Sequence, residues 1–122
     1  MNRDRRAFLA AGAAVALLGA ARAARAENKI IDVVIEARKV VGDNVARVAE
    51  GDAVTLRWST DEAVTVHLHG YDMKLSIAPD APAEMTFEAF AAGRFPVTSH
   101  GFGGHHGDDE EVVLLYLEVH PG

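Results

Sequence analysis

The clearest structural signal in this 122-residue sequence is EGDAVTLRW, residues 50–58. Its first three residues have the composition of a tight turn. Apolar Val54, Leu56 and Trp58 then occupy every second position, with polar residues between them. Because successive side chains of a strand point to opposite faces, this alternation predicts a strand with one buried face.

The same alternation recurs on both sides of this stretch, and turn-forming Gly, Pro, Asn and Asp residues separate the repeats. The final apolar run is hydrophobic on both faces, which is typical of a strand in the middle of a sheet. No segment after Ala26 has a convincing helical period. Seven or eight short strands of this kind predict an all-β, antiparallel β-sandwich. Besides residues 54–59, the predicted strands cover residues 31–36, 64–69, 73–77, 85–88, 95–98 and 112–119.

The first 26 residues have the composition of an export signal. Arg5 and Arg6 precede Phe-Leu and an Ala-rich apolar run, and residues 24–26 form a small-x-small cleavage site. This order resembles a twin-arginine signal peptide, and the run is shorter than the ~20 apolar residues of a membrane span. We therefore predict a signal peptide at residues 1–26 and one domain at residues 27–122. The mature protein is expected to be exported, in a bacterium to the periplasm, with no membrane span after cleavage.

Composition excludes several classes of function. The formal net charge is −6, and the acidic residues are concentrated after the predicted signal. An acidic surface repels phosphate backbones, so we do not expect nucleic-acid binding. The chain has no cysteine, which excludes disulfides, thiolate metal ligands and cysteine nucleophiles. No serine–histidine–acid signature of a hydrolase stands out.

Five of the six histidines gather in two segments, VHLHGYD (66–72) and SHGFGGHHG (99–107). His67 and His69 lie two positions apart on a predicted strand, so both side chains leave the same face. The second segment is rich in glycine, which lets a loop fold back tightly. Imidazoles bind copper(II) most tightly among the common divalent metals, and zinc is the alternative. We therefore predict a metal site whose candidate ligands are His67, His69, His100, His105 and His106.

Some neighbouring positions leave questions open. Strict alternation along residues 95–99 places Ser99 inward and His100 on the opposite face, so either the strand ends earlier or His100 is not a ligand. Met73 could add a soft axial ligand, but its spacing favours a core position. The four acids at residues 108–111 could supply an oxygen ligand or form a solvated charge run. The sixth histidine, at the C-terminal end, is expected to be exposed.

The order of these segments resembles a cupredoxin. Residues 50–58 look like that fold's Gly-Asp-x-Val-x-Leu strand, and residues 78–87 resemble its turn and Thr-Phe strand. Residues 92–97 resemble the strand that leads to the copper loop, and the likeness extends over residues 30–119. The resemblance implies a Greek-key β-sandwich with copper ligands in the early histidine segment and in the later loop.

One departure from the cupredoxin pattern decides the kind of copper site. In blue-copper cupredoxins a cysteine follows the glycine equivalent to Gly93 by six positions, and here that residue is Ser99. A serine hydroxyl cannot supply the covalent thiolate of a type 1 centre. The segment at residues 67–70 also resembles the His-x-His-Gly motif of multicopper oxidases, but their further His-x-His motifs do not occur in this sequence.

These observations leave three hypotheses. The first, which we favour, is an exported copper-binding carrier, buffer or chaperone that exchanges metal with another exported metalloprotein. The second is a metal-free interaction domain of the same fold. The third is a type 2 copper enzyme, because the histidine segments also resemble copper–zinc superoxide dismutase. That family's cysteine pair and full zinc loop are missing here, so we do not expect an enzyme.

Overall fold

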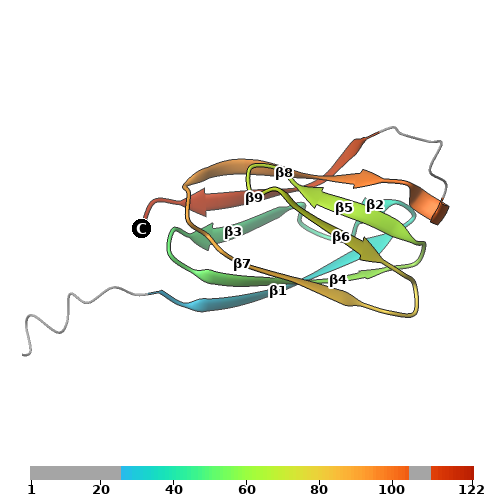
Figure 1. Cartoon of the computed structure of the whole chain (residues 1–122), viewed down its shortest axis with the longest axis horizontal. Coiled ribbons are helices and arrows are strands. Elements are labelled where there is room, and N and C mark those ends of the chain that lie inside the picture. Colours follow the sequence, from blue (N-terminus) through green and yellow to red (C-terminus); the bar gives the residue numbers. More distant parts are fainter. Residues whose placement is uncertain (1–25, 105–110) are drawn as a thin grey trace, which may run out of the picture.

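The computed structural model describes residues 26–104 and 111–122, and it consists of two β-sheets packed face to face (Figure 1). No helix within these ranges is long and apolar enough to cross a membrane. One short 3-10 turn, η1 (Phe102–Gly104), follows β8. The strands in chain order are β1 (Asn28–Glu36), β2 (Lys39–Val40), β3 (Val45–Ala49), β4 (Ala53–Thr60), β5 (Val64–Leu68), β6 (Met73–Ile77), β7 (Ala83–Glu88), β8 (Gly93–His100) and β9 (Val112–His120).

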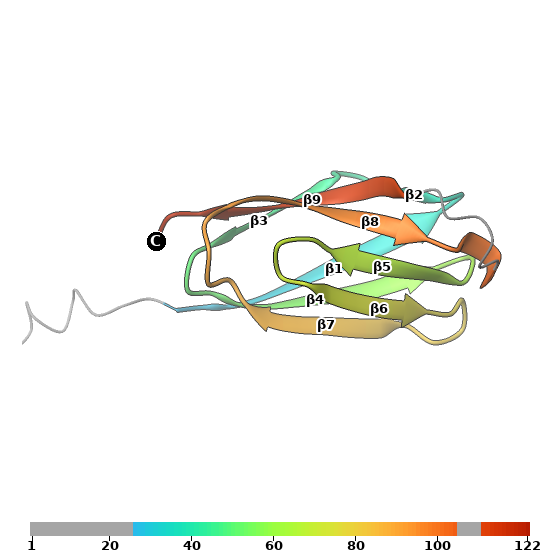
Figure 2. The same cartoon turned by 45° about the horizontal axis from the view of Figure 1, so that its top comes forward.

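One sheet has the strand order β2-β1-β4-β7, and the other has the order β3-β9-β8-β5-β6 (Figure 2). The all-β sandwich predicted from the sequence is confirmed. Five of its seven strand pairs are antiparallel, as expected. The pairs β1–β4 and β3–β9 run parallel instead. Chain segments between parallel neighbours must cross over, and here the connection from β1 to β4 passes through β3 of the other sheet.

The hydrophobic core lies between the two sheets. The predicted core residues of β4, Val54, Leu56 and Trp58, are all fully buried. Burying a large apolar side chain contributes about 1.5–3 kcal/mol, so this strand anchors the sandwich. β5 follows the same rule: Val66 is buried, and the adjacent His67 therefore lies on the outer face of the five-stranded sheet.

A β-bulge in β9 explains why two consecutive leucines are buried. Val97 of β8 pairs with Leu115, and the next residue, Thr98, pairs with Val113, so Leu114 has no partner across the ladder. Leu114 and Leu115 are nevertheless both buried. β9 lies between β3 and β8, as its apolar pattern predicts. A bulge bends and twists its strand, so it redirects the start of β9 and the residue before it.

The sequence analysis did not predict β2 and β3. β2 has only two residues, which is too short to show a period. β3 alternates, but one of its two buried residues is the small Ala46, with Val48 as the other. A strand whose core face carries one alanine and one valine gives a weak apolar signal.

The turn between β5 and β6 is fixed by close packing. Gly70 has a φ of 87°, and a Cβ atom at this position would lie 2.4 Å from Cδ1 of Phe95. The next residue, Tyr71, places its ring edge-on to Phe95, with centroids 5.0 Å apart. Its hydroxyl donates to the carbonyl of Ala91 at 3.0 Å. The residue before this turn, His69, is therefore held in a defined position.

Candidate metal centre

The two histidines of the early segment lie together on the outer face of the five-stranded sheet. His67 is in β5 and pairs with Thr98 of β8. His69 directly follows β5, and its backbone N–H donates to the carbonyl of Pro96 at 3.0 Å. The centroids of the two imidazole rings are 4.0 Å apart. The spacing argument for a shared face therefore agrees with the structure.

Glu111 brings a carboxylate to these imidazoles from the start of β9. Its Oε2 lies 2.9 Å from Nε2 of His69 and 3.1 Å from Nε2 of His100. The hydroxyl of Thr98 donates to the same oxygen at 2.6 Å. β8 and β9 are paired up to the residues next to His100 and Glu111, so the ladder brings these two residues opposite each other.

His100 resolves the question that strand alternation raised. β8 extends through His100, and Ser99 before it is buried on the core side. His100 therefore lies on the outer face, which is also the face of His67, and the centroids of these two rings are 6.4 Å apart. The expected alternative of an early strand end is therefore wrong. His67, His69 and His100 gather on the outer surface of the sheet.

His67, His69 and Glu111 form the most compact group of ligands. One ligand atom from each lies within 4.8 Å of the others. Nitrogen and oxygen ligands bind a metal at ~2.0–2.2 Å, so two ligands of one ion are at most about 4 Å apart. The three groups would therefore have to approach one another by about 1 Å or more to bind one ion. The other two predicted ligands, His105 and His106, lie outside the described residues.

The electrostatics of Glu111 and His67 favour the protonation states that metal binding needs. Hydrogen bonds from Thr98 and then His69 lower the pKa of Glu111 to about 2, so its carboxylate is ionised at neutral pH. Burial, followed by the charges of His69 and Lys74, lowers the pKa of His67, so this imidazole is neutral at neutral pH. Ionised carboxylates and neutral imidazoles are the forms that bind metals.

Two other residues considered from the sequence lie away from the group. Met73 pairs with the buried Leu68 and packs against the core, so it is on the opposite side of the sheet from His67. The core position favoured for Met73 is confirmed. Ser99, at the place of the blue-copper cysteine, is 1 % exposed, and its hydroxyl lies 3.4 Å from the carbonyl of Val112. Ser99 therefore faces the core and not the histidines.

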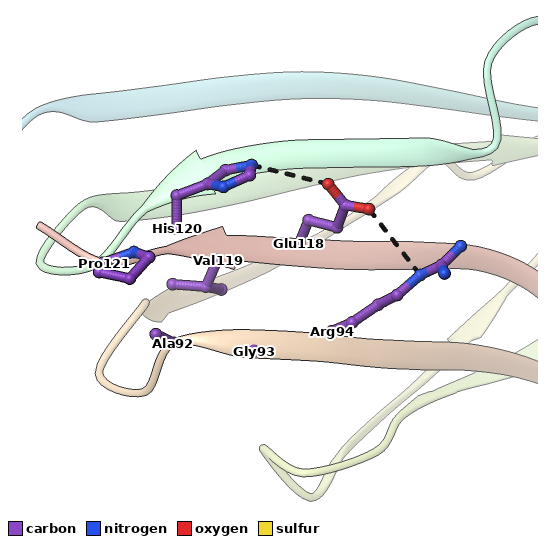
Figure 3. A pocket seen from close by; sticks show the side chains of 7 residues that line it. All are labelled: Ala92, Gly93, Arg94, Glu118, Val119, His120 and Pro121. Atoms are coloured by element: carbon purple, nitrogen blue, oxygen red, sulfur yellow. Dashed lines mark ion pairs between the residues drawn. The ribbon is translucent and has the colours of Figure 1, made fainter.

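His120 lies in an open depression at the other end of β9. Its Nε2 is 3.6 Å from Oε1 of Glu118, and Arg94 lies 3.8 Å from the other carboxylate oxygen (Figure 3). Exposure of His120 agrees with expectation. The depression offers one imidazole and a carboxylate that is already paired with two arginines, Arg47 and Arg94, which is a poor ligand set. It is lined by Ala92, Gly93, Arg94, Glu118, Val119, His120 and Pro121.

The sequence analysis did not single out Glu111 or Thr98. Glu111 was considered only as the last of four consecutive acids, residues 108–111. The signal that distinguishes it is its position directly before a strand predicted to be central. Thr98 carried no signal, because its role depends on pairing with His67 across two strands that are distant in sequence.

Comparisons with known proteins support the fold and not a specific activity. No known family model matches the sequence, and no curated protein matches it. A blue copper oxidase from Nitrosomonas europaea is similar in structure, with a TM-score of 0.55 and 19% identity over 78% of this chain and 39% of that chain. A laccase-like multi-copper oxidase from Ochrobactrum sp. has a TM-score of 0.60 and 14% identity, over 84% of this chain and 34% of that chain.

A heme-copper terminal oxidase is also similar, with a TM-score of 0.57 and 18% identity over 75% of this chain and 64% of that chain. The chain thus spans less than two thirds of each of these proteins. The likenesses show a cupredoxin-like fold, of the kind that forms domains of copper oxidases. On the outer face of that fold lies a His/Glu group that could hold a metal ion.

Proposed function

We propose that this protein is an exported copper-binding carrier, buffer or chaperone that holds copper(II) through His67, His69 and Glu111. The observation that supports this proposal is the convergence of two imidazoles and one ionised carboxylate, from distant parts of the chain, within 4.8 Å. His100 is proposed as a further ligand because it already contacts the same carboxylate oxygen. His105 and His106, which precede Glu111 in the sequence, are proposed as additional ligands.

The donor set favours copper(II) and zinc over softer or harder ions. Imidazole nitrogens suit both metals, and copper(II) binds more tightly in the usual order of stability. The chain has no cysteine, and Met73 lies on the core side, so no soft sulfur ligand is available to this group from the described residues. The proposed site is therefore of the type 2 kind, in which copper is held by nitrogen and oxygen.

A copper titration of matched variants tests this proposal. We expect His67→Ala and His69→Ala each to weaken copper(II) binding by tenfold or more, which corresponds to ~1.4 kcal/mol. His120→Ala is the control, because its imidazole is exposed at the other end of β9 and its loss should leave affinity unchanged. Competition with a chelator of known affinity gives the dissociation constants. If both variants bind like wild type, the metal-free interaction domain becomes the better account.

Export is proposed from the predicted signal. Intact mass measurement of the protein recovered from its native compartment should give a mature chain that begins at Glu27. The carrier role needs a second protein, and we propose another exported metalloprotein as the partner. Transfer of copper from the loaded protein to such a partner, faster than release to a chelator, would distinguish a carrier from a buffer.

A further inference from the structure

Asp52 is a buried carboxylate in the turn between β3 and β4, and the metal proposal does not use it. The residue is 2% exposed. Its Oδ2 accepts hydrogen bonds from the backbone N–H of Ala49 at 2.8 Å and from Nζ of Lys29 at 3.0 Å. Its Oδ1 accepts a longer bond, 3.3 Å, from the backbone N–H of Glu27. Buried charges need paired partners, and the Oδ1 side of this carboxylate faces a single uncharged donor among the described residues.

The nitrogen of Glu27 is held against Asp52 by the strand that begins there. The N–H of Ala53 donates to the carbonyl of Glu27 at 2.8 Å, just before the parallel pairing of β1 with β4 starts. The side chain of Glu27 also lies 3.5 Å from Nζ of Lys29. Ala26, on the other side of the peptide bond, is exposed, and so is Glu27. The bond between them is therefore accessible, while the nitrogen of that bond already faces the buried carboxylate.

We propose that the Ala26–Glu27 bond is a processing site and that the α-ammonium group released at Glu27 forms an ion pair with Asp52. A peptidase of the signal-peptidase class hydrolyses the bond: water adds across it, Ala26 keeps a carboxylate, and Glu27 gains an amino group. That group is protonated at neutral pH, because an α-amino group has a pKa of ~8. The proposal rests on the predicted cleavage after Ala26 and is independent of the metal site.

Processing would change the strength of this contact without moving the backbone. One neutral N–H becomes a cation with three donors, placed beside the oxygen of Asp52 that has the weaker partner. Charge-assisted hydrogen bonds are shorter and about twice as strong as neutral ones. Cleavage would thus fasten the first strand to the β3–β4 turn, so the processed chain would be more stable than its precursor.

The test compares the full chain with its product cut before Glu27, and the product with the same protein acetylated at its α-amino group. Urea unfolding is followed by the fluorescence of Trp58, the single tryptophan, which is buried. We expect the free product to have a higher unfolding midpoint than both other forms. The difference should vanish in Asp52→Asn and persist in Asp80→Asn, which alters an exposed acid in the turn after β6.

If Asp52→Asn does not fold, a second measurement tests whether the α-ammonium group pairs with Asp52. The pKa of the Glu27 α-amino group in the processed wild type is measured by nuclear magnetic resonance, and we expect it to be raised above ~8. An ordinary α-amino pKa, equal midpoints for the free and acetylated forms, or a native chain that begins at another residue would each overturn the proposal.

Discussion

The Oε2 of Glu111 lies 2.9 Å from Nε2 of His69, although 42 positions separate the two residues in the chain. β8 lies between β5 and β9 in the five-stranded sheet, and the side chains of His69 and Glu111 meet over β8, where both contact the hydroxyl of Thr98. This contact joins the carboxylate of the His67, His69 and Glu111 group to the histidine segment. The chemistry of the site therefore depends on strand order as well as on the histidines.

Replacing Glu111 by Gln should weaken copper(II) binding by about tenfold, or ~1.4 kcal/mol. Glutamine keeps the size of the side chain but removes the ionised oxygen that lies between His69 and His100. Glu84→Gln, which removes an exposed acid of β7 in the other sheet, is the matched control for net charge. Equal affinities for the two variants would show that Glu111 acts only through its long-range charge.

The copper(II) form should be pale. The chain has no cysteine, and Ser99 faces the core, so no thiolate can give the intense charge-transfer band of a blue-copper centre. Electron paramagnetic resonance should instead show nitrogen coordination of the type 2 kind. A strong blue colour in the purified protein would contradict the proposed ligand set.

Gly70→Ala should destabilise the fold more than Gly42→Ala. Both glycines have a positive φ, 87° and 86°, so each substitution places a Cβ in a strained backbone at a cost of about 1–2 kcal/mol. The Cβ at Gly42 would meet open space, whereas the Cβ at Gly70 would lie 2.4 Å from the ring of Phe95. Overpacking adds about 1–3 kcal/mol.

Urea unfolding of the two glycine variants and wild type gives the comparison. The difference between the variants isolates the contact with Phe95, because the backbone strain is common to both. Similar losses of stability would mean that the Phe95 ring moves aside freely. Since His69 directly precedes Gly70, copper affinity measured on the same samples reports whether the turn also positions the imidazole.

Wild type should be more stable than Asp52→Asn mainly between about pH 4 and pH 10. The N–H of Ala49, and then Lys29, lower the pKa of Asp52, so its contribution is present above the unfolded value of ~3.9 and is lost as the pH falls through the folded pKa. The hydrogen bond to Asp52 raises the pKa of Lys29, so that contribution is present below ~10.4 and is lost at higher pH.

Urea unfolding at acidic, neutral and alkaline pH checks this window. The gap between wild type and the variant should be largest at neutral pH and should close towards both extremes. A gap that stays constant at all three pH values would show that Asp52 acts by its shape and hydrogen bonds alone, and not by its charge.

The fold was predictable where local pattern and burial coincide. Residues 50–58 and 64–69 alternate cleanly, and their buried faces follow directly from the sequence. The short β2 and the weakly apolar β3 were missed because too few large side chains mark their inner faces. Parallel pairing of β1 with β4 was also missed, since the partner of a strand is set by contacts distant in sequence.

Only the part of the candidate site that lies within one stretch of sequence, His67 and His69, could be predicted. The shared face of His67 and His69 follows from their spacing of two residues, because that spacing holds on any strand. The role of Glu111 depends on the pairing of β8 with β9, which no local pattern encodes. His100 illustrates the same limit: alternation gave its face correctly, but only the position of the other histidines shows that this is the relevant face.

His67 lies on the outer face of the sheet, whereas Val66 and Leu68 beside it are buried. The residues that would bind a metal are therefore separate from the residues that form the core. The core closes without any help from the imidazoles, in contrast to zinc fingers, which are unfolded without metal. An ion bound at this surface would not be needed for folding. It would add stability only by mass action, through its concentration relative to its dissociation constant. Substitution of a few surface side chains could therefore change the metal specificity, while the core of the sandwich stays the same.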